Sequence, residues 1–291
     1  MLSLHTNNAA LSAQSALGRT QSSLSTSMTR LSTGYRINSA MDDAAGLQIA
    51  TRLKAQTSGM AVAMRNTQNS TSMLQTAEGA LNEVNNMLVR MKDLATQAAD
   101  QSSTDKDKTA MQAEFDNLGK EILNVMKNTK FGGQELLKDG TISKEMTFQI
   151  GASDGEQMSI DLSASMGATG TVMTSLSSVS VQFATASTVS AGAEISTASK
   201  ANTMISTITT AIDNISTVRS SLGAAANRLE HVYNNLSNIS TNTAAATGRI
   251  MDVDFATESA NMTSNQMLLQ ASTAMLKQSN SMSSMVMSLL Q

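Results

Sequence analysis

The sequence predicts a mainly α protein, in which long antiparallel coiled-coil helical rods come from both chain ends and a small β-hairpin region lies in the middle. Apolar residues recur at alternating steps of three and four over long stretches, which is the spacing of helical seams. The 291 residues include no proline, whose ring would cost a helix interior about 3 kcal/mol. Aromatic residues make up only 2% of the chain, whereas 22 methionines can fill gaps between helices.

The longest regular stretch covers residues 47–98. About 50 residues that rise roughly 1.5 Å each could form a rod of roughly 80 Å. Its seam positions are Leu74, Ala77, Leu81, Val84, Leu88, Met91, Ala95 and Ala98. A second rod is expected over residues 205–243, with seam positions Ile205, Ile208, Ile212, Ile215, Val218, Leu222, Ala225, Leu229, Val232, Leu236, Ile239 and Thr243. An apolar stripe of this length has to be buried along another helix.

Shorter elements are expected between the two rods. A helix that folds back beside the first rod is predicted by apolar residues at steps of four and three, namely Met111, Phe115, Leu118, Ile122 and Val125. The period then changes to alternation, which predicts a β-hairpin from Met146, Phe148, Ile150, Met158, Ile160 and Leu162. Residues 163–199 are rich in Ser and Thr and almost uncharged, so we expect loop and irregular β-structure there.

The two ends of the chain are alike, because each carries a helical apolar stripe and almost no charge on its other faces. From Ser259 onward the only charged side chain is Lys277. Such helices are poorly solvated alone, so we expect them to be disordered in the monomer and to pair with each other and with neighbouring copies. Head-to-tail contacts that do not close form a helical filament. The sequence therefore predicts a self-assembling rod protein.

Composition and motifs exclude several other classes of function. A net charge of -3 without a basic block argues against a nucleic-acid partner, and no apolar run approaches the roughly 20 residues that span a membrane. The start of the chain lacks the layout of a cleaved signal peptide. His5 and His231 stand apart with no cysteine in the chain, so we predict no catalytic site, no metal and no cofactor. Asp42, Asp43, Asp252 and Asp254 are expected to cap helices.

Several sequence blocks are specific enough to indicate a family, and together they resemble bacterial flagellin. The N-terminal block is LSTGYRINSAMDDAAG at residues 31–46, and the C-terminal block is GRIMDVDFATE at residues 248–258. Further blocks of the same kind are QTAEGALNE at 75–83, MKDLATQ at 91–97, QIGASDGE at 149–156 and MSLLQ at 287–291. The opening HTN at residues 5–7 and MRN at residues 64–66 resemble flagellins of the lateral, surface-swarming type.

The resemblance implies a structural subunit that self-assembles into the helical bacterial flagellar filament used for motility. Such a subunit is exported unfolded through the flagellar type III pathway, is secreted to the extracellular flagellum and polymerises at the distal tip. Residues 1–40 and 252–291 would then be terminal helices that form the inner filament-core domain. Residues 41–162 and 200–251 would form a rod-shaped helical domain with the β-hairpin, and residues 163–199 a short variable surface segment in place of large outer domains.

The resemblance also implies partners. These are further copies of the chain, a flagellar export chaperone, the filament cap, the hook-filament junction proteins and a host Toll-like receptor. The candidate stripe for the chaperone and the filament core is Leu268, Leu269, Met275, Leu276, Met282 and Leu289. The implied receptor contact is Arg90, Leu94 and Glu114. Arg90 and Leu94 lie on one helix face beside the seam, so Leu94 either widens the core or meets a partner.

Another function class shares the heptad pattern, namely a different self-associating coiled-coil structural or signalling protein. A signalling rod of the chemoreceptor kind should carry membrane spans, and the sequence shows none. An enzyme would need a constellation of polar groups in a pocket, and no motif in the chain predicts one. We therefore expect a structural protein and no enzyme.

Overall fold

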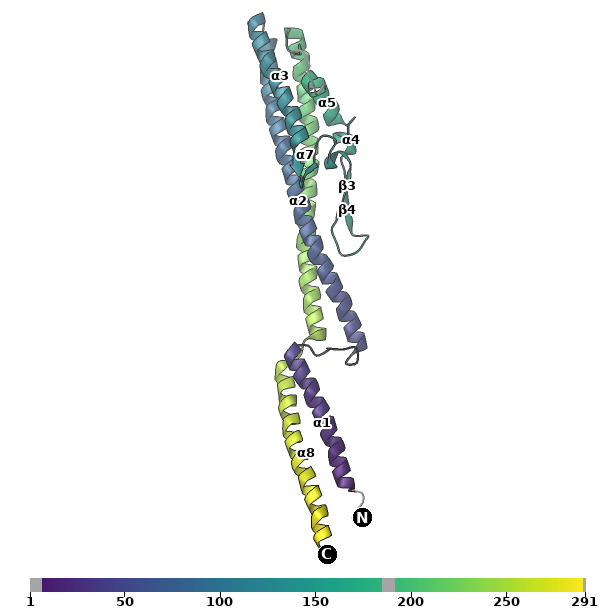
Figure 1. Ribbon diagram of the computed structural model, residues 1–291. Coiled ribbons are helices and arrows are strands. Elements are labelled where there is room, and N and C mark those ends of the chain that lie inside the picture. Colours follow the sequence, from purple (N-terminus) through teal and green to yellow (C-terminus); the bar gives the residue numbers. More distant parts are fainter. Residues whose placement is uncertain (1–6, 185–191, 290–291) are drawn as a thin grey trace. The chain divides into compact units, whose positions relative to one another are not determined.

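The computed structural model describes residues 7–184 and 192–289, with only the backbone described at Ala184 and at residues 282–289. The chain divides into two compact units. The terminal unit comprises Met1–Thr57 and Thr241–Gln291, and the central unit comprises Ser58–Ser240. Helices dominate both units (Figure 1), and strands are short and confined to the central unit. The predicted mainly α fold class is confirmed.

The terminal unit is built on two helices from opposite chain ends, α1 (Asn8–Thr33) and α8 (Phe255–Leu289), which lie side by side in Figure 1. Asn7 caps α1 by accepting a 3.1 Å bond from the amide of Ala10, and its Nδ2 donates to the Oγ of Ser279 at 3.0 Å. At the other end of α1, the guanidinium of Arg30 lies 3.8 Å from the carboxylate of Glu258. The two helices are therefore antiparallel, and the chain ends pair as predicted.

Two linking segments pair with each other in the same unit. Tyr35, which follows α1, forms an isolated antiparallel bridge with Asp252, which precedes α8. The amide of Arg36 donates to the carbonyl of Met251 at 2.6 Å. Gly34 ends α1 with a left-handed backbone (φ 76°), a conformation that costs glycine little because it has no Cβ.

The core of the central unit lies along α2 (Ala44–Ala99) and α7 (Ala198–Met251), which run antiparallel beside each other (Figure 1). All eight predicted seam residues of the first rod are at most 1% exposed. Seven seam residues of α7 are buried, namely Ile208, Ile215, Val218, Leu222, Ala225, Leu229 and Leu236. Ile205, Ile212 and Val232 are half-buried, and Ile239 is 39% exposed. The guanidinium of Arg219 on α7 joins the carboxylate of Glu78 on α2 at 2.7 Å.

The predicted fold-back helix is α3 (Asp105–Asn128), which packs in the same core. A reciprocal capping box begins it, because Thr104 and Asp107 each bond the backbone amide of the other. Met111, Phe115 and Ile122 are buried, and Leu118 and Val125 are half-buried against them. The steps of four and three thus correctly identified the buried face of α3.

Two small hairpins follow α3. Strands β1 (Lys130–Phe131) and β2 (Gln134–Glu135) are joined by Gly132 and Gly133, both at positive φ, as a two-residue hairpin turn requires. After a 3-10 turn, η1 (Thr141–Ser143), comes the predicted hairpin of β3 (Glu145–Gln149) and β4 (Gln157–Asp161). Its antiparallel register pairs Met146 with Ile160 and Phe148 with Met158. Met146 and Met158 are buried in the core.

The expectation of loop and irregular β-structure over residues 163–199 is wrong for residues 163–184, which are mostly helical. Three short helices form in the described part before residue 185, α4 (Ser163–Met166), α5 (Thr171–Val179) and α6 (Val181–Ala184). The reason is packing, because Val172, Leu176 and Val179 follow each other at steps of four and three and are at most 1% exposed in the core. The Ser- and Thr-rich composition hid this stripe, and residues 185–191 of the segment lie outside the described residues.

Candidate assembly and interaction surfaces

The α1 and α8 pair leaves large apolar side chains in solvent. Leu11 and Met28 on α1 are each 57% exposed, and Met275 on α8 is 67% exposed. Met267 and Leu268 are also more than half exposed. Exposed apolar side chains gathered on paired helices are typical of a surface that another protein covers.

The predicted stripe on α8 is divided between two environments. Leu269 and Leu276 are half-buried in the terminal unit, whereas Leu268 and Met275 are exposed. The side chains of Met282 and Leu289 lie outside the described residues. Neighbouring positions on a helix point about 100° apart, so steps of seven from 268 and from 269 follow different sides of α8.

The structure joins two of the three candidate receptor residues. Arg90 on α2 and Glu114 on α3 form an ion pair with 2.8 Å between Nη2 and Oε1, and Nε donates to the same oxygen at 2.9 Å. Both side chains are about half exposed. Leu94 is only 2% exposed and belongs to the core of the central unit. Leu94 could either widen the core or meet a partner, and the structure therefore supports the first alternative.

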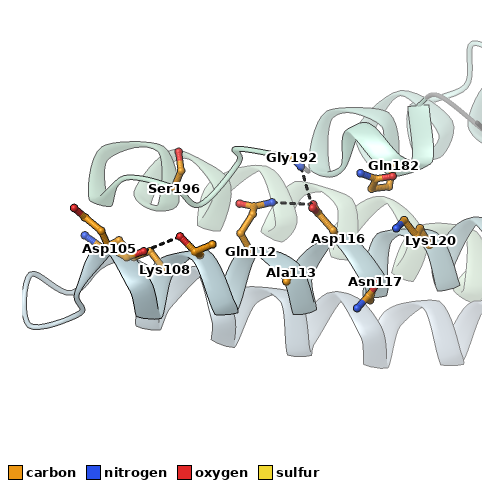
Figure 2. Close-up of a pocket in the computed structure, with 11 residues that line it drawn as sticks. Asp105, Lys108, Gln112, Ala113, Asp116, Asn117, Lys120, Gln182, Gly192 and Ser196 are labelled. Atoms are coloured by element: carbon orange, nitrogen blue, oxygen red, sulfur yellow. Dashed lines mark hydrogen bonds between the residues drawn. The ribbon is translucent and has the colours of Figure 1, made fainter. Parts of the chain in front are cut away.

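A polar cluster that sequence reasoning missed lies between α3 and the segment before α7 (Figure 2). Gln112 and Asp116 are each 5% exposed. The amide nitrogen of Gln112 donates to Asp116 at 2.9 Å, as Figure 2 shows. It also donates to Glu194 at 2.7 Å, and the carbonyl oxygen of Gln112 accepts from the amide of Ile195. The amide of Gly192 donates to Asp116 at 2.9 Å. The cluster fastens residues 192–195 to α3 beside a cavity of about 450 Å³.

A weak sequence signal for this cluster exists. Gln112 and Asp116 each follow a seam residue of α3 by one position, so they lie four residues apart at the edge of its buried face. Their partner Glu194 is about 80 residues away in sequence, and no local pattern links it to them.

Two of the four predicted helix caps are present, at Asp43 and Asp254, whereas Asp42 caps the turn before α2 and Asp252 pairs with Tyr35 in the isolated bridge. The carboxylate of Asp42 accepts bonds from the amides of Ser39 at 2.9 Å and Asn38 at 3.1 Å, and these bonds lower its pKa. Asp43 accepts from the amide of Gly46 at the start of α2. Asp254 accepts from the hydroxyl of Thr257 and the amide of Ala256, and both bonds lower its pKa.

Metal sites and membrane-spanning helices are absent from the part of the chain that the structure describes. Residues 7–184 and 192–289 contain no group of three or more His, Cys, Asp or Glu side chains placed to hold a metal ion. In the same ranges, every helix is too short or too polar to traverse a lipid bilayer. His231 is exposed on α7, and His5 lies outside the described residues.

Comparison with known proteins gives matches at both ends of the chain. Residues 4–141 match the family described as the bacterial flagellin N-terminal helical region, and residues 205–290 match the bacterial flagellin C-terminal helical region. A flagellin of Halalkalibacterium halodurans is 39% identical over 91% of this chain and 90% of the relative. A flagellin of Bacillus subtilis is 37% identical over 98% of both chains. Polar flagellin F of Vibrio parahaemolyticus is 33% identical over 99% of both.

These matches agree with the features described above. The two family regions contain the helices that pair in the terminal unit and the long helices of the central unit. The family is one of structural proteins, which agrees with the prediction that the chain is no enzyme. The chain belongs to the bacterial flagellin family.

Proposed function

We propose that this chain builds its filament through the paired terminal helices. As a flagellin it is a structural subunit of the bacterial flagellar filament. The observation that carries the proposal is the set of exposed apolar residues on α1 and α8, with Met275 at 67%. Burying a large apolar side chain gains roughly 1.5–3 kcal/mol, so several such contacts per copy can hold a polymer together. Nothing observed favours a different coiled-coil protein.

In this proposal the chain has three regions. Residues 1–40 and 252–291 form the inner core of the filament. Residues 41–162 and 200–251 form the rod-shaped helical domain with the β-hairpin. Residues 163–199 form a short outer surface, supported by the exposed hydroxyls of Ser177 and Ser178 on α5. Because Ser175 and Ser180 are buried, only one side of this segment is available as a surface.

The same proposal includes export and its partners. The chain is secreted unfolded through the flagellar type III pathway and joins the extracellular filament at its tip, where the cap and the hook-filament junction proteins are its neighbours. An export chaperone covers the apolar positions of α8 before export. The half-buried Leu269 and Leu276 would then bind the chaperone first and α1 later. Replacing both by Ser should weaken chaperone binding more than tenfold, and unchanged affinity would place the chaperone elsewhere.

A host Toll-like receptor is the remaining proposed partner. The exposed ion pair of Arg90 and Glu114 supports a contact there, because charged side chains on the surface are free to exchange partners. Leu94 would support that surface by packing in the core of the central unit. The assignment to the lateral type of flagellum rests on the sequence at residues 5–7 and 64–66. Of these residues, His5 and Thr6 lie outside the part of the chain that the structure describes.

Electron microscopy of the purified chain tests the filament function. We expect the full chain, concentrated at neutral pH, to form long helical filaments of uniform diameter. Short aggregates or a soluble coiled-coil dimer at every concentration would contradict the proposal. The outcome separates a filament subunit from a signalling coiled coil, because the latter closes into a small oligomer.

A further inference from the structure

Met41 is the most exposed large apolar side chain in the described part of the chain. It is 97% exposed, so it makes almost no contact within its own molecule. Its backbone is nonetheless fixed, because Asp42 accepts from the amides of Asn38 and Ser39 and the hydroxyl of Ser39 accepts from the amide of Met41. We call residues 38–43 the Met41 turn. The turn presents a flexible apolar side chain from an ordered base.

The same unit contains an apolar groove of about 450 Å³, which we call the Tyr35 groove. It lies between the first turns of α2 and the last turns of α7. Its walls include Leu47 and Ala50 from α2 and Ala244 and Gly248 from α7. The small side chains leave the space open, and most of the accessible lining is apolar. A volume of this size is ample for one methionine side chain.

Two charged side chains line the Tyr35 groove, the cation Lys54 and the carboxylate Asp252, and Lys54 is the one that can attract an acidic partner. Lys54 lines the Tyr35 groove and forms no ion pair with any residue that the structure describes. The Met41 turn carries Asp42 and Asp43 directly after Met41. Asp42 is 4.0 Å from Arg30 and so is only partly compensated, and Asp43 has no ion pair in the described chain. The ammonium of Lys54 at the groove would therefore face the carboxylates of Asp42 and Asp43 on the turn.

We propose that the Met41 turn of one copy docks into the Tyr35 groove of a second copy. The thioether of Met41 fills the apolar floor, and the ammonium of Lys54 faces the carboxylates of Asp42 and Asp43. The contact joins two different patches of identical chains, so it repeats without closing and propagates a polymer. The inference rests on the proposed filament function and assigns one of its contacts.

The absence of cysteine from the chain allows a direct test. One variant carries Met41→Cys, and a second carries Thr51→Cys, at an exposed lining position of the groove. The two are copolymerised in equal amounts and mildly oxidised. We expect a disulfide-linked dimer at least fivefold more abundant than in filaments of either variant alone. The matched control replaces Thr51→Cys by Thr76→Cys, an exposed threonine on the same helix outside the groove, and should give no enrichment.

The outcomes separate the docking contact from the filament function. Mixed filaments without an enriched dimer, or with equal enrichment from the Thr76 control, would overturn the contact while the filament function stands. If the unmodified chain forms no filaments, both fail. A second measurement uses the critical concentration for polymerisation. Met41→Ser should raise it at least tenfold and Met41→Leu less than threefold, with unchanged monomer melting because Met41 is exposed. Equal critical concentrations for the two variants would contradict docking.

Discussion

Gly59 in α2 and Ala152 in the loop between β3 and β4 touch so closely that no side chain fits between them. A Cβ on Gly59 would lie 2.8 Å from the Cβ of Ala152 and 3.3 Å from its Cα. Glycine in a helix interior costs roughly 0.5–1 kcal/mol relative to alanine. The close approach explains why glycine occupies position 59, because the absence of a side chain lets the hairpin loop contact the helix.

Gly59→Ala should therefore lift the hairpin loop from α2. Gly79 in the same helix is the matched control, since nothing lies within 4 Å of the Cβ that alanine would add there. We expect Gly79→Ala to stabilise the chain by about 0.5–1 kcal/mol and Gly59→Ala to be about 1–3 kcal/mol less stable than that control. Denaturant unfolding measures the difference, and hydrogen exchange should quicken in residues 150–156. Equal stabilisation by both substitutions would show that the loop does not rest on Gly59.

Gln112 should be needed to hold residues 192–195 on α3. Gln112→Leu keeps the side chain's approximate size but removes the amide that Asp116 and Glu194 share. Leaving two carboxylates without this donor should cost about 2–4 kcal/mol. Gln75→Leu, at an exposed position of α2, should change stability by less than about 0.5 kcal/mol. If both variants unfold at the same denaturant concentration, the cluster does not stabilise the unit.

Substitutions at Leu94 and Arg90 should distinguish a role in packing from a role in receptor recognition. Leu94→Ala should lower stability by about 2–5 kcal/mol, because Leu94 is buried. Arg90→Ala removes an exposed ion pair and should cost about 0–1 kcal/mol. In a receptor-signalling assay with correctly folded monomer, we expect Arg90→Ala to lose most activity. Full signalling from that variant would remove Arg90 from the proposed contact.

Acid should weaken the start of α3 through Asp107. Bonds from the hydroxyl and amide of Thr104 lower the pKa of Asp107 below its ordinary 3.8. A lowered folded-state pKa contributes stability that is present above pH 3.8 and is lost as the pH falls below it. At pH 7 the Asp107→Asn variant should therefore have a lower melting temperature than the unmodified chain. This difference in melting temperature should shrink below pH 3.8. A difference that is constant from pH 7 to pH 2 would rule out the charged cap.

The regular parts of the fold could be predicted because their signal is local. Long runs of seam residues identified α2, α7 and α3, and alternation identified the hairpin of β3 and β4. The start of α2 also follows from local chemistry, because Asp43, which is predicted to cap a helix, accepts from the amide of Gly46. In these elements the spacing of apolar residues identifies most of the buried face, with Leu94 and Ile239 as exceptions.

The parts that could not be predicted depend on contacts distant in sequence. The helices α4, α5 and α6 form where short apolar side chains meet the core, although their composition resembles a loop. The Gln112 cluster depends on Glu194, about 80 positions away. Leu94 could not be assigned because its position at the edge of the seam fits both alternatives until the packing of the central unit is known.

Assembly through the paired terminal helices is tested by comparing the full chain with a chain that lacks residues 277–291. The truncation removes the last part of α8, including the segment whose Ser279 bonds Asn7, and leaves the central unit complete. Sedimentation and electron microscopy measure the polymer, and circular dichroism measures the helices. We expect filaments from the full chain, and only helical monomer from the truncated chain. Normal filaments from the truncated chain would contradict the claim that the paired terminal helices build the filament.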